Sequence, residues 1–404
     1  MYDTYADPEE HIIADYYVES TYPLMKIGRM IAAEESTGSW VISERETKEL
    51  IEKYGAKVVE TNEEKSTVKI AYPIINLNPD DGVALLLSTA AGNIFGMSAI
   101  KNIKLLDLKF PENYVKEFKG PNFGIDGIRK LTGTEKSGRP HVGTIIKPDV
   151  GLEPKEFAET CYEAAVGGCD FIKDDELLGS PVYCTREERV SKVMEKLDIV
   201  KEETGRNVLY ACNITTRCDK ILDALDIVQD NGGNCVMLNF VTTGFSALRV
   251  LSENTKLPVH CHRDMHAAFT RNPKHGIEMM VVSELVRLCG GDQLHTGTAA
   301  GKMSASEYGV LNYNKFLTQG WFHFKTVFPV ASGGVHPGVV ENNIKILGND
   351  IVLQAGGGIH GHPKGTRAGS VAMRQAVDAA MKGIKIEEYA KSHEELRLWV
   401  EKMK

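Results

Sequence analysis

Eight short apolar runs recur along the chain from about residue 140, and each ends in polar residues or glycine. Unbroken apolar character over about five residues is typical of strands that are buried on both faces of a parallel sheet. The intervals between the runs, roughly 23 to 38 residues, leave room for one crossover helix each time. The runs are HVGTIIKP, CDFIKDDE, NVLYACNI, NCVMLNFV, LPVHCHRD, DQLHTGT, VFPVASGG and IVLQAGGG. This repeat predicts an α/β fold of the (β/α)8 type, a TIM barrel.

The residues before the first run lack the eightfold pattern. They mix strand-like and helix-like stretches, among them AAEESTGSW, KSTVKIAYPI and DDGVALLLSTAAGN. We therefore expect a smaller α+β domain of ferredoxin-like type over residues 1–120, followed by the barrel over residues 121–404. The Pro- and Gly-containing segment FPENYVKEFKGPNFG is the expected connector, and IEEYAKSHEELRLWVEKM is typical of an amphipathic closing helix.

Composition excludes several classes of function. With 404 residues, 42% of them apolar, the chain can bury a large core, and its net charge of −8 comes with no basic patch for nucleic acid or an acidic membrane. No apolar run approaches the roughly 20 residues that span a bilayer, and the acidic start does not read as a signal peptide, so we expect a cytoplasmic protein. The eight cysteines form no CxxC pair and are expected to be reduced core residues. A small-molecule role is favoured.

Catalytic groups in barrels of this type lie at the carboxyl ends of the strands, so those positions locate the expected active site. In this chain they carry charged, polar and glycine residues that few structural scaffolds need. Any one of them could be an ordinary salt-bridge partner or turn residue, but eight such strand ends together indicate an active site. The set is Lys147, Lys173, Asp175, Glu176, Asn213, His260, His262, Arg263, His295, Ser332, Gly333, Gly334, Gly356, Gly357 and Gly358.

The segment GGCDFIKDDELLGSP sets one lysine beside three acids at the end of a predicted buried strand. Lys173 and Asp175 lie on the same side of that strand, and the adjacent acids Asp175 and Glu176 offer hard oxygen ligands of the kind that Mg2+ prefers. The lysine is unexpected there, because an ammonium would repel the cation. It makes sense either as a counter-charge or after modification into an anion, and the residues alone do not decide between the two.

Phosphate recognition is indicated at several strand ends. His262 offers a titratable base, and Arg263 offers a planar fork suited to phosphate. The glycine turns at 332–334 and 356–358 fit a phosphate site built from backbone N–H groups, although each could be a bare turn. Lys302 is placed to act as a mobile charged lid, or it is an ordinary solvated lysine.

Six motifs stand in an order that resembles a known family. They are ESTGSW, GGCDFIKDDE, HCHRDMHA, HTGTAAGKM, VASGGVHPG and LQAGGGIHGHP. Together they closely resemble the large subunit of ribulose bisphosphate carboxylase/oxygenase (RuBisCO), over nearly the whole chain. The resemblance implies that Lys173 is carbamylated by carbon dioxide and binds Mg2+ together with Asp175 and Glu176. It also implies that Lys147 handles protons at the reacting carbon and that His262 assists the later steps.

The resemblance further implies two phosphate sites and active sites that are shared between subunits. One phosphate site would consist of Arg263, His295 and Ser332. The other would consist of Ser39, Trp40, Lys302, Gly334, Gly356 and Gly357. A homodimer or a higher homo-oligomer is expected, because four residues would reach into the barrel of a neighbouring subunit. These are Glu34, Ser39, Trp40 and Asn93.

Two departures from the family pattern favour a non-carboxylating relative. The family carboxylases have a threonine before IKP and a second lysine after it, where this chain has Ile145 and Asp149. Ile145 removes a hydroxyl near the substrate, and the carboxylate of Asp149 should raise the pKa of Lys147. We therefore expect a RuBisCO-like protein that uses Mg2+ to enolise, isomerise or decarboxylate another phosphorylated ketose, as some members do in methylthioribose salvage.

Two alternatives stay open. Retention of Arg263, His295 and Lys302 is what a substrate with two phosphates requires, and it favours a true ribulose 1,5-bisphosphate carboxylase/oxygenase. The other alternative is a barrel that has lost catalysis and only binds a ligand. It is disfavoured because the expected metal ligands are all present in the sequence.

Overall fold

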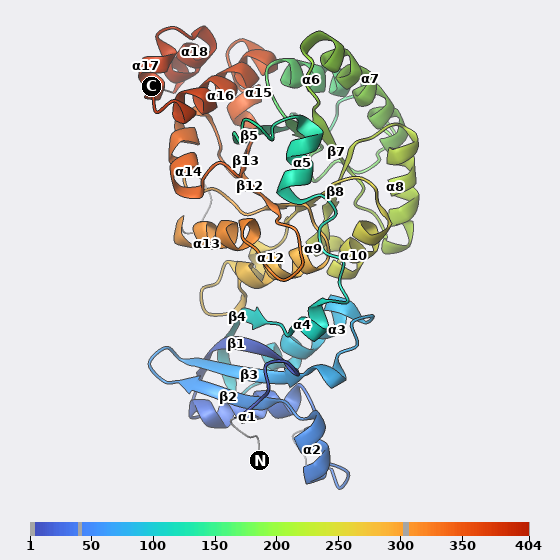
Figure 1. Ribbon diagram of the computed structural model, residues 1–404, viewed down its shortest axis with the longest axis vertical. Coiled ribbons are helices and arrows are strands. Elements are labelled where there is room, and N and C mark those ends of the chain that lie inside the picture. Colours follow the sequence, from blue (N-terminus) through green and yellow to red (C-terminus); the bar gives the residue numbers. More distant parts are fainter. Residues whose placement is uncertain (1–4, 39–42, 302–306, 404) are drawn as a thin grey trace. The chain divides into compact units, whose positions relative to one another are not determined.

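The computed structural model describes residues 5–38, 43–301 and 307–403. The chain divides into two compact units (Figure 1). The first contains Met1–Lys119 and Met265–Cys289, and the second contains Gly120–Asp264 and Gly290–Lys404. Residues 265–289, which we expected to belong to the barrel domain, thus group with the N-terminal unit. Within the described ranges, no helix is long and apolar enough to cross a membrane.

The first unit is an α+β domain around a five-stranded sheet with the strand order β10-β4-β1-β3-β2. Its neighbours pair antiparallel, except that the short β10 adds to β4 in parallel. Every second residue of β1 from Ile12 to Val18 is buried, which is the period of a strand with one face on the core. The elements are β1 (His11–Ser20), α1 (Leu24–Glu34), α2 (Lys48–Tyr54), β2 (Lys57–Asn62), β3 (Thr67–Pro73), α3 (Gly82–Ala90), β4 (Ile100–Lys109), α4 (Glu112–Val115), α11 (Ala267–Thr270), β10 (Gly276–Ile277) and α12 (Met279–Leu288), with 3-10 turns at Ile74–Asn76 and Asn93–Gly96.

The second unit is a closed barrel of eight parallel strands, and all eight predicted runs form its strands. The (β/α)8 prediction is therefore confirmed. Each strand is buried over nearly its whole length, which explains why the sequence reads as unbroken apolar runs. The strands are β5 (His141–Ile145), β6 (Phe171–Lys173), β7 (Leu209–Asn213), β8 (Cys235–Asn239), β9 (Val259–His262), β11 (Gln293–His295), β12 (Phe328–Ser332) and β13 (Val352–Ala355).

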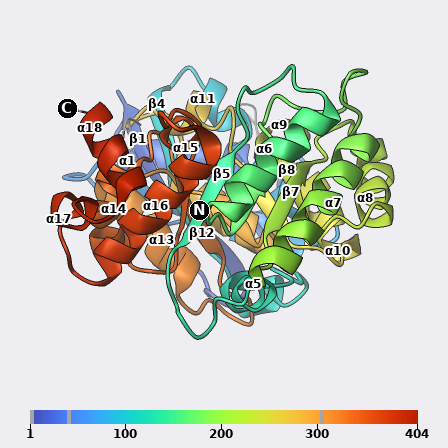
Figure 2. The same cartoon turned by 90° about the horizontal axis from the view of Figure 1, so that it is seen from above.

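Helices surround the barrel, and one of them covers its amino end. Figure 2 shows α6, α7 and α8 outside the strands β7 and β8. Ile125 and Ile128 of α5 share one core cluster with residues that begin strands, such as Leu209 and Phe328, so α5 packs at the amino end and the carboxyl end is left for a site. The helices are α5 (Gly124–Thr132), α6 (Pro154–Val166), α7 (Arg186–Thr204), α8 (Ile221–Asp230), α9 (Phe240–Thr243), α10 (Phe245–Asn254), α13 (Glu307–Thr318), α14 (Val340–Leu347), α15 (Gly357–His360), α16 (Gly365–Met381), α17 (Ile386–Ala390) and α18 (Glu394–Lys402), with 3-10 turns at Cys218–Lys220 and Pro337–Val339.

The C-terminal segment forms two helices where the sequence predicts one. The backbone of His393, with φ −129° and ψ 100°, is extended and separates α17 from α18. Buried Leu396 and Trp399 keep the amphipathic character of α18 that the sequence indicates.

A buried ion pair anchors the end of β6. Asp174 and Arg189 of α7 have no exposed side-chain surface, and Arg189 Nη2 donates to Asp174 Oδ2 at 2.9 Å. Asp174 also accepts hydrogen bonds from the hydroxyl of Tyr210 and from the backbone N–H of Asn213 at 2.8 Å. Arg189 donates in addition to the carbonyl of Gly179 at 2.9 Å. The pair therefore joins the strand end, the loop that follows it and the next strand.

Replacing Arg189 by Met should destabilise the barrel unit by about 3 to 5 kcal/mol, because the substitution leaves the carboxylate of Asp174 buried without its cation. Urea unfolding followed by circular dichroism measures this as a lower midpoint. The matched control is Arg397→Ala, which removes an exposed α18 pair with Glu401 and should change stability by less than about 1 kcal/mol. Equal midpoints for the two variants would contradict the anchoring role of Arg189.

Candidate active site

Lys173 is the last residue of β6, and its side chain is completely buried. Its Nζ donates to the backbone carbonyl of Asp174 at 2.7 Å and to Glu176 Oε2 at 3.4 Å. Burial lowers the pKa of Lys173, and the charges of Glu176 and Asp175 offset this only in part. The environment therefore favours the uncharged amine more than water does, and it is the uncharged amine that can react with carbon dioxide.

Lys147, just beyond β5, bridges two carboxylates. Its Nζ donates to Asp175 Oδ2 at 2.8 Å and also to Asp149 Oδ1. Burial lowers the pKa of Lys147, but the hydrogen bonds to Asp149 and Asp175 outweigh burial, and the net shift is upward. The expected direction of the Asp149 effect is thus confirmed. Asp149 itself is 44% exposed, so water weakens its influence, whereas Asp175 is 3% exposed.

His262, at the end of β9, lies against Glu176, with 3.4 Å between His262 Nε2 and Glu176 Oε2. Its Nδ1 accepts a hydrogen bond from the backbone N–H of Asp264 at 3.3 Å. Burial and the nearby charge of Lys173 lower the pKa of His262, so the ring is neutral near pH 7. With Nδ1 as the acceptor, Nε2 carries the hydrogen of the neutral ring, and Nδ1 is the atom at which His262 can accept a proton.

A chain of buried polar groups links β9, β11 and β12. The Nε2 atoms of His260 and His295 are 2.8 Å apart, so one donates and the other accepts. His295 Nδ1 lies 2.7 Å from the hydroxyl oxygen of Ser332, and His260 Nδ1 lies 2.8 Å from Gln293 Oε1. Burial lowers the pKa of both histidines well below the usual value, and both rings are neutral. The chain fixes the ring of His295 beside Ser332.

Arg263 is a buried cation that fits a bound anion. Its side chain is 7% exposed, and burial lowers its pKa to about 10. Its charge also lowers the pKa of His295, so the two groups are near each other. In the described part of the chain no carboxylate influences the charge of Arg263, and a buried charge without such a partner is costly. A phosphate bound beside Arg263 would remove that cost.

A cavity of about 510 Å3 opens at the carboxyl ends of the strands. It is lined by Ile145, Lys147, Glu176 and Gln354 and by the two glycine turns. Gly333 and Gly334 have φ values of 100° and 81°, which favour glycine. A Cβ on Gly356 would come within 3.1 Å of Lys147 Cε, whereas the space beside Gly357 is open toward the cavity. The turns therefore admit a ligand where side chains would fill the space.

The structure brings most of the predicted site residues to this end of the barrel. The positions gathered there are Lys147, Lys173, Asp175, Glu176, His262, Arg263, His295, Ser332, Gly333, Gly334, Gly356 and Gly357. Glu34 and Asn93 lie in the first unit, where Asn93 Nδ2 donates to Glu34 Oε1 at 3.2 Å. The predicted residues Ser39, Trp40 and Lys302 lie outside the described residues.

Gln354 is a site residue that the sequence reasoning missed. It is 1% exposed and lines the cavity, yet neither atom of its amide has a hydrogen-bond partner among the described residues. A buried polar group without a partner is costly, so a ligand is the expected partner. A signal was available, because Gln354 is a polar residue inside the apolar strand run IVLQAGGG.

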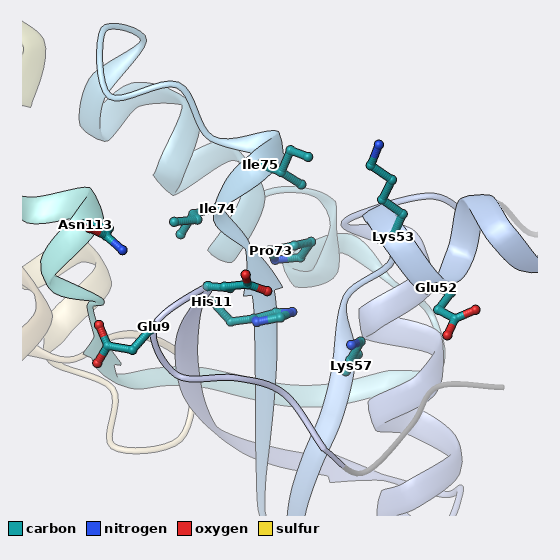
Figure 3. A pocket seen from close by; sticks show the side chains of 10 residues that line it. Glu9, His11, Glu52, Lys53, Lys57, Pro73, Ile74, Ile75 and Asn113 are labelled. Carbon is teal, nitrogen blue, oxygen red and sulfur yellow. The ribbon is translucent and has the colours of Figure 1, made fainter.

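A second cavity, about 620 Å3, lies in the first unit (Figure 3). Its lining mixes acids such as Glu9 and Glu52 with Lys53, Lys57 and His11. None of the predicted site residues lines it, and its opposing charges favour no single type of ligand.

The residues at the end of β6 fit a carbamate-bound Mg2+. Among the described residues no cluster of three or more His, Cys, Asp or Glu side chains is placed to hold a metal, so Asp175 and Glu176 need a further oxygen ligand. A carbamate on Lys173 would provide it, and the burial of that amine favours the form that reacts with carbon dioxide.

Comparison with family models gives the family. The model described as the ribulose bisphosphate carboxylase large chain, catalytic domain, matches residues 124–402, and the model of the N-terminal domain of the same chain matches residues 1–114. This chain belongs to the RuBisCO large-chain family. Enzymes of this family use Mg2+ and a carbamylated lysine, in agreement with the expected cofactors.

Individual RuBisCO relatives match almost end to end. Ribulose bisphosphate carboxylase of Pyrococcus furiosus is 44% identical, over 98% of this chain and 95% of its own. The octameric RuBisCO of Pyrococcus horikoshii aligns with a TM-score of 0.93 and 41% identity, over 99% of this chain and 95% of its own. A rubisco-like protein from Burkholderia fungorum aligns with a TM-score of 0.87 and 30% identity, over 97% of this chain and 99% of its own.

The expectation of a non-carboxylating RuBisCO-like protein is therefore wrong. It rested on Ile145 and Asp149, whereas the relatives of higher identity over the full length are carboxylases. The carboxylate of Asp149 is partly hydrated, and water weakens its effect on the pKa of Lys147. Asp149 is therefore a smaller obstacle to carboxylation than its charge alone suggests. The alternative of a true carboxylase is favoured.

Replacing Asp149 by Asn should lower the pKa of Lys147, because the variant loses one of the two carboxylates that stabilise the ammonium. Competitive acetylation of Lys147 as a function of pH, read by mass spectrometry, measures this pKa. The control is Asp198→Asn, which changes an exposed carboxylate on α7 and should leave the pKa of Lys147 unchanged. An unchanged or higher pKa in Asp149→Asn would contradict the ion-pair account.

Proposed function

We propose that this chain is a ribulose 1,5-bisphosphate carboxylase/oxygenase that requires Mg2+ and a carbamate on Lys173. The observation that carries the proposal is the 44% identity to a carboxylase over 98% of the chain. The geometry of the site supports it, because Lys147, Glu176 and the glycine turns line one cavity. The buried cation Arg263 and the neutral rings of His262 and His295 lie at the ends of other strands of the same barrel.

Lys173 as its carbamate, Asp175 and Glu176 would hold the Mg2+. When bound, the ion polarises the substrate oxygens and stabilises the negative charge that an enediolate carries. The side chains of this chain would supply the remaining requirements, which are orientation of the substrate and the movement of protons.

Lys147 and His262 would move protons in opposite directions. The raised pKa of Lys147 keeps its ammonium protonated, so this residue would donate a proton to the reacting carbon. Burial lowers the pKa of His262 and favours its neutral ring, so this residue would accept a proton at Nδ1, in place of the hydrogen bond from the backbone N–H of Asp264. The division of roles follows from the two environments. Asp149 would keep the ammonium of Lys147 charged when Asp175 binds the metal, and burial keeps the ring of His262 neutral.

The two ends of the substrate would bind to different groups. Arg263, His295 and Ser332 would bind one phosphate, since Arg263 offers a buried fork and Ser332 a hydroxyl. The glycine turns at 333–334 and 356–357 would hold the other. Ser39, Trp40 and Lys302 are assigned to this second phosphate by resemblance alone.

We further propose that the chain functions as a homo-oligomer of at least two copies. One solved relative is an octamer. Glu34 and Asn93 of one subunit, together with Ser39 and Trp40, which follow Glu34 in the sequence, would complete the active site of a neighbour, as the family resemblance implies.

Purified protein, preincubated with carbon dioxide and Mg2+ under anaerobic conditions, should incorporate labelled bicarbonate into acid-stable product from ribulose 1,5-bisphosphate. Lys173→Ala, or removal of Mg2+ by a chelator, should reduce the rate by at least about a hundredfold, because the developing negative charge loses its stabilisation.

The control is Lys192→Ala, which changes an exposed lysine on α7 and should keep the wild-type rate. If folded wild-type protein gives no more acid-stable label than Lys173→Ala does, the proposed function is wrong.

A further inference from the structure

The last helix, α18, is held firmly against the barrel unit. The indole of Trp399 stacks on the imidazole of His336, with 4.8 Å between ring centroids and 22° between planes. The ring of His362 lies 2.9 Å from the carbonyl of Glu395, and Leu396 donates its N–H to Gln375 at 3.0 Å. These contacts fix α18 beside the loop that follows β12.

The end of α18 forms part of the wall of the catalytic cavity. Trp399, Lys402 and Met403 line the same 510 Å3 cavity as Lys147 and Glu176. His336, on which Trp399 stacks, comes shortly after the glycine turn at 333–334 in the same loop. The helix therefore meets the cavity on the side of that glycine turn.

Lys402 carries the positive charge that this wall presents. Its Nζ donates to the backbone carbonyl of Gly361, and no carboxylate among the described residues pairs with it. The adjacent Glu401 instead pairs with Arg397 at 2.9 Å. The other lysine that lines the cavity, Lys147, already pairs with two carboxylates. Of the two lining lysines, Lys402 is thus the exposed one without an acidic partner among the described residues, and its charge is available to an anion that enters the cavity.

The ligand that fits this arrangement is a phosphate group. Glycine turns leave space at the cavity wall, notably beside Gly357, and bring backbone groups close to whatever binds. A lysine ammonium acts as a mobile point charge for phosphate. Its hydrogen bond to the neutral carbonyl of Gly361 is weaker than a hydrogen bond to an anion would be, so a phosphate can replace that carbonyl as the partner.

We propose that Lys402 binds a substrate phosphate at the glycine turns and that α18 positions it through the stacking of Trp399 on His336. The inference rests on the proposed function for the identity of the substrate, a sugar bisphosphate. It assigns a binding role to a residue of the last helix, whereas the site residues expected in the barrel all lie at or just after strand ends.

The test is isothermal titration calorimetry, which measures the Kd. Protein treated with Mg2+ and carbon dioxide is titrated with ribulose 1,5-bisphosphate and, separately, with inorganic phosphate. Lys402→Ala should weaken binding of each ligand about tenfold, the loss of one charge-assisted hydrogen bond, and Lys402→Glu should weaken it further. Lys402→Arg should bind within about threefold of wild type, because the positive charge is kept. In steady-state carboxylation, Lys402→Ala should raise KM and leave kcat nearly unchanged.

The matched control is Lys391→Ala, which removes an exposed lysine between α17 and α18 that pairs with Glu388 away from the cavity. Wild-type affinity in Lys402→Ala, or equal weakening in Lys391→Ala, would overturn the inference. Phosphate binding that depends on Lys402 in a protein that neither binds the bisphosphate nor fixes carbon dioxide would refute the proposed function and leave the inference standing. Carboxylation by the wild type, with an unchanged KM in Lys402→Ala, would support the proposed function and overturn the inference.

Discussion

The burial of one lysine among acids is the constraint on which the rest of the site depends. The amine of Lys173 has no exposed surface at the end of β6, and desolvation lowers its pKa although carboxylates surround it. The strand directs Asp174 away from this cluster, where Arg189 neutralises it in a buried pair. The acids that follow β6 therefore have different roles. Asp174 anchors the end of the strand, and Asp175 and Glu176 remain available for a metal.

Burial also sets the charges at the carboxyl ends of β9 and β11. His260, His262 and His295 are all driven toward the neutral state by burial, whereas Arg263 must remain a cation and has no acidic partner among the described residues. A site with buried positive charge and neutral hydrogen-bonding rings is prepared for a polyanion. The amide of Gln354, which has no hydrogen-bond partner among residues 5–38, 43–301 and 307–403, adds a polar group that a ligand would satisfy. These features suit a phosphorylated sugar better than they suit a neutral substrate.

Much of this could be predicted from the sequence, and the failures have physical causes. The eight strands were predictable because strands buried on both faces read as apolar runs, and their polar ends located the site. The grouping of residues 265–289 with the first unit was not, because it involves β10, a strand of two residues that pairs with distant β4. Lys402 was missed because its place at the cavity depends on packing of a terminal helix. Asp149 misled because a sequence shows a charge but not its hydration, and nothing in the structure explains the substitution at Ile145.

The central claim, that buried Lys173 takes up carbon dioxide as a carbamate beside Asp175 and Glu176, is tested most directly by 13C NMR. Protein equilibrated with 13C-labelled carbon dioxide should show a carbamate resonance that is absent from Lys173→Arg, and Mg2+ should slow its exchange with free carbon dioxide. Identical spectra for wild type and Lys173→Arg, with and without Mg2+, would contradict the account.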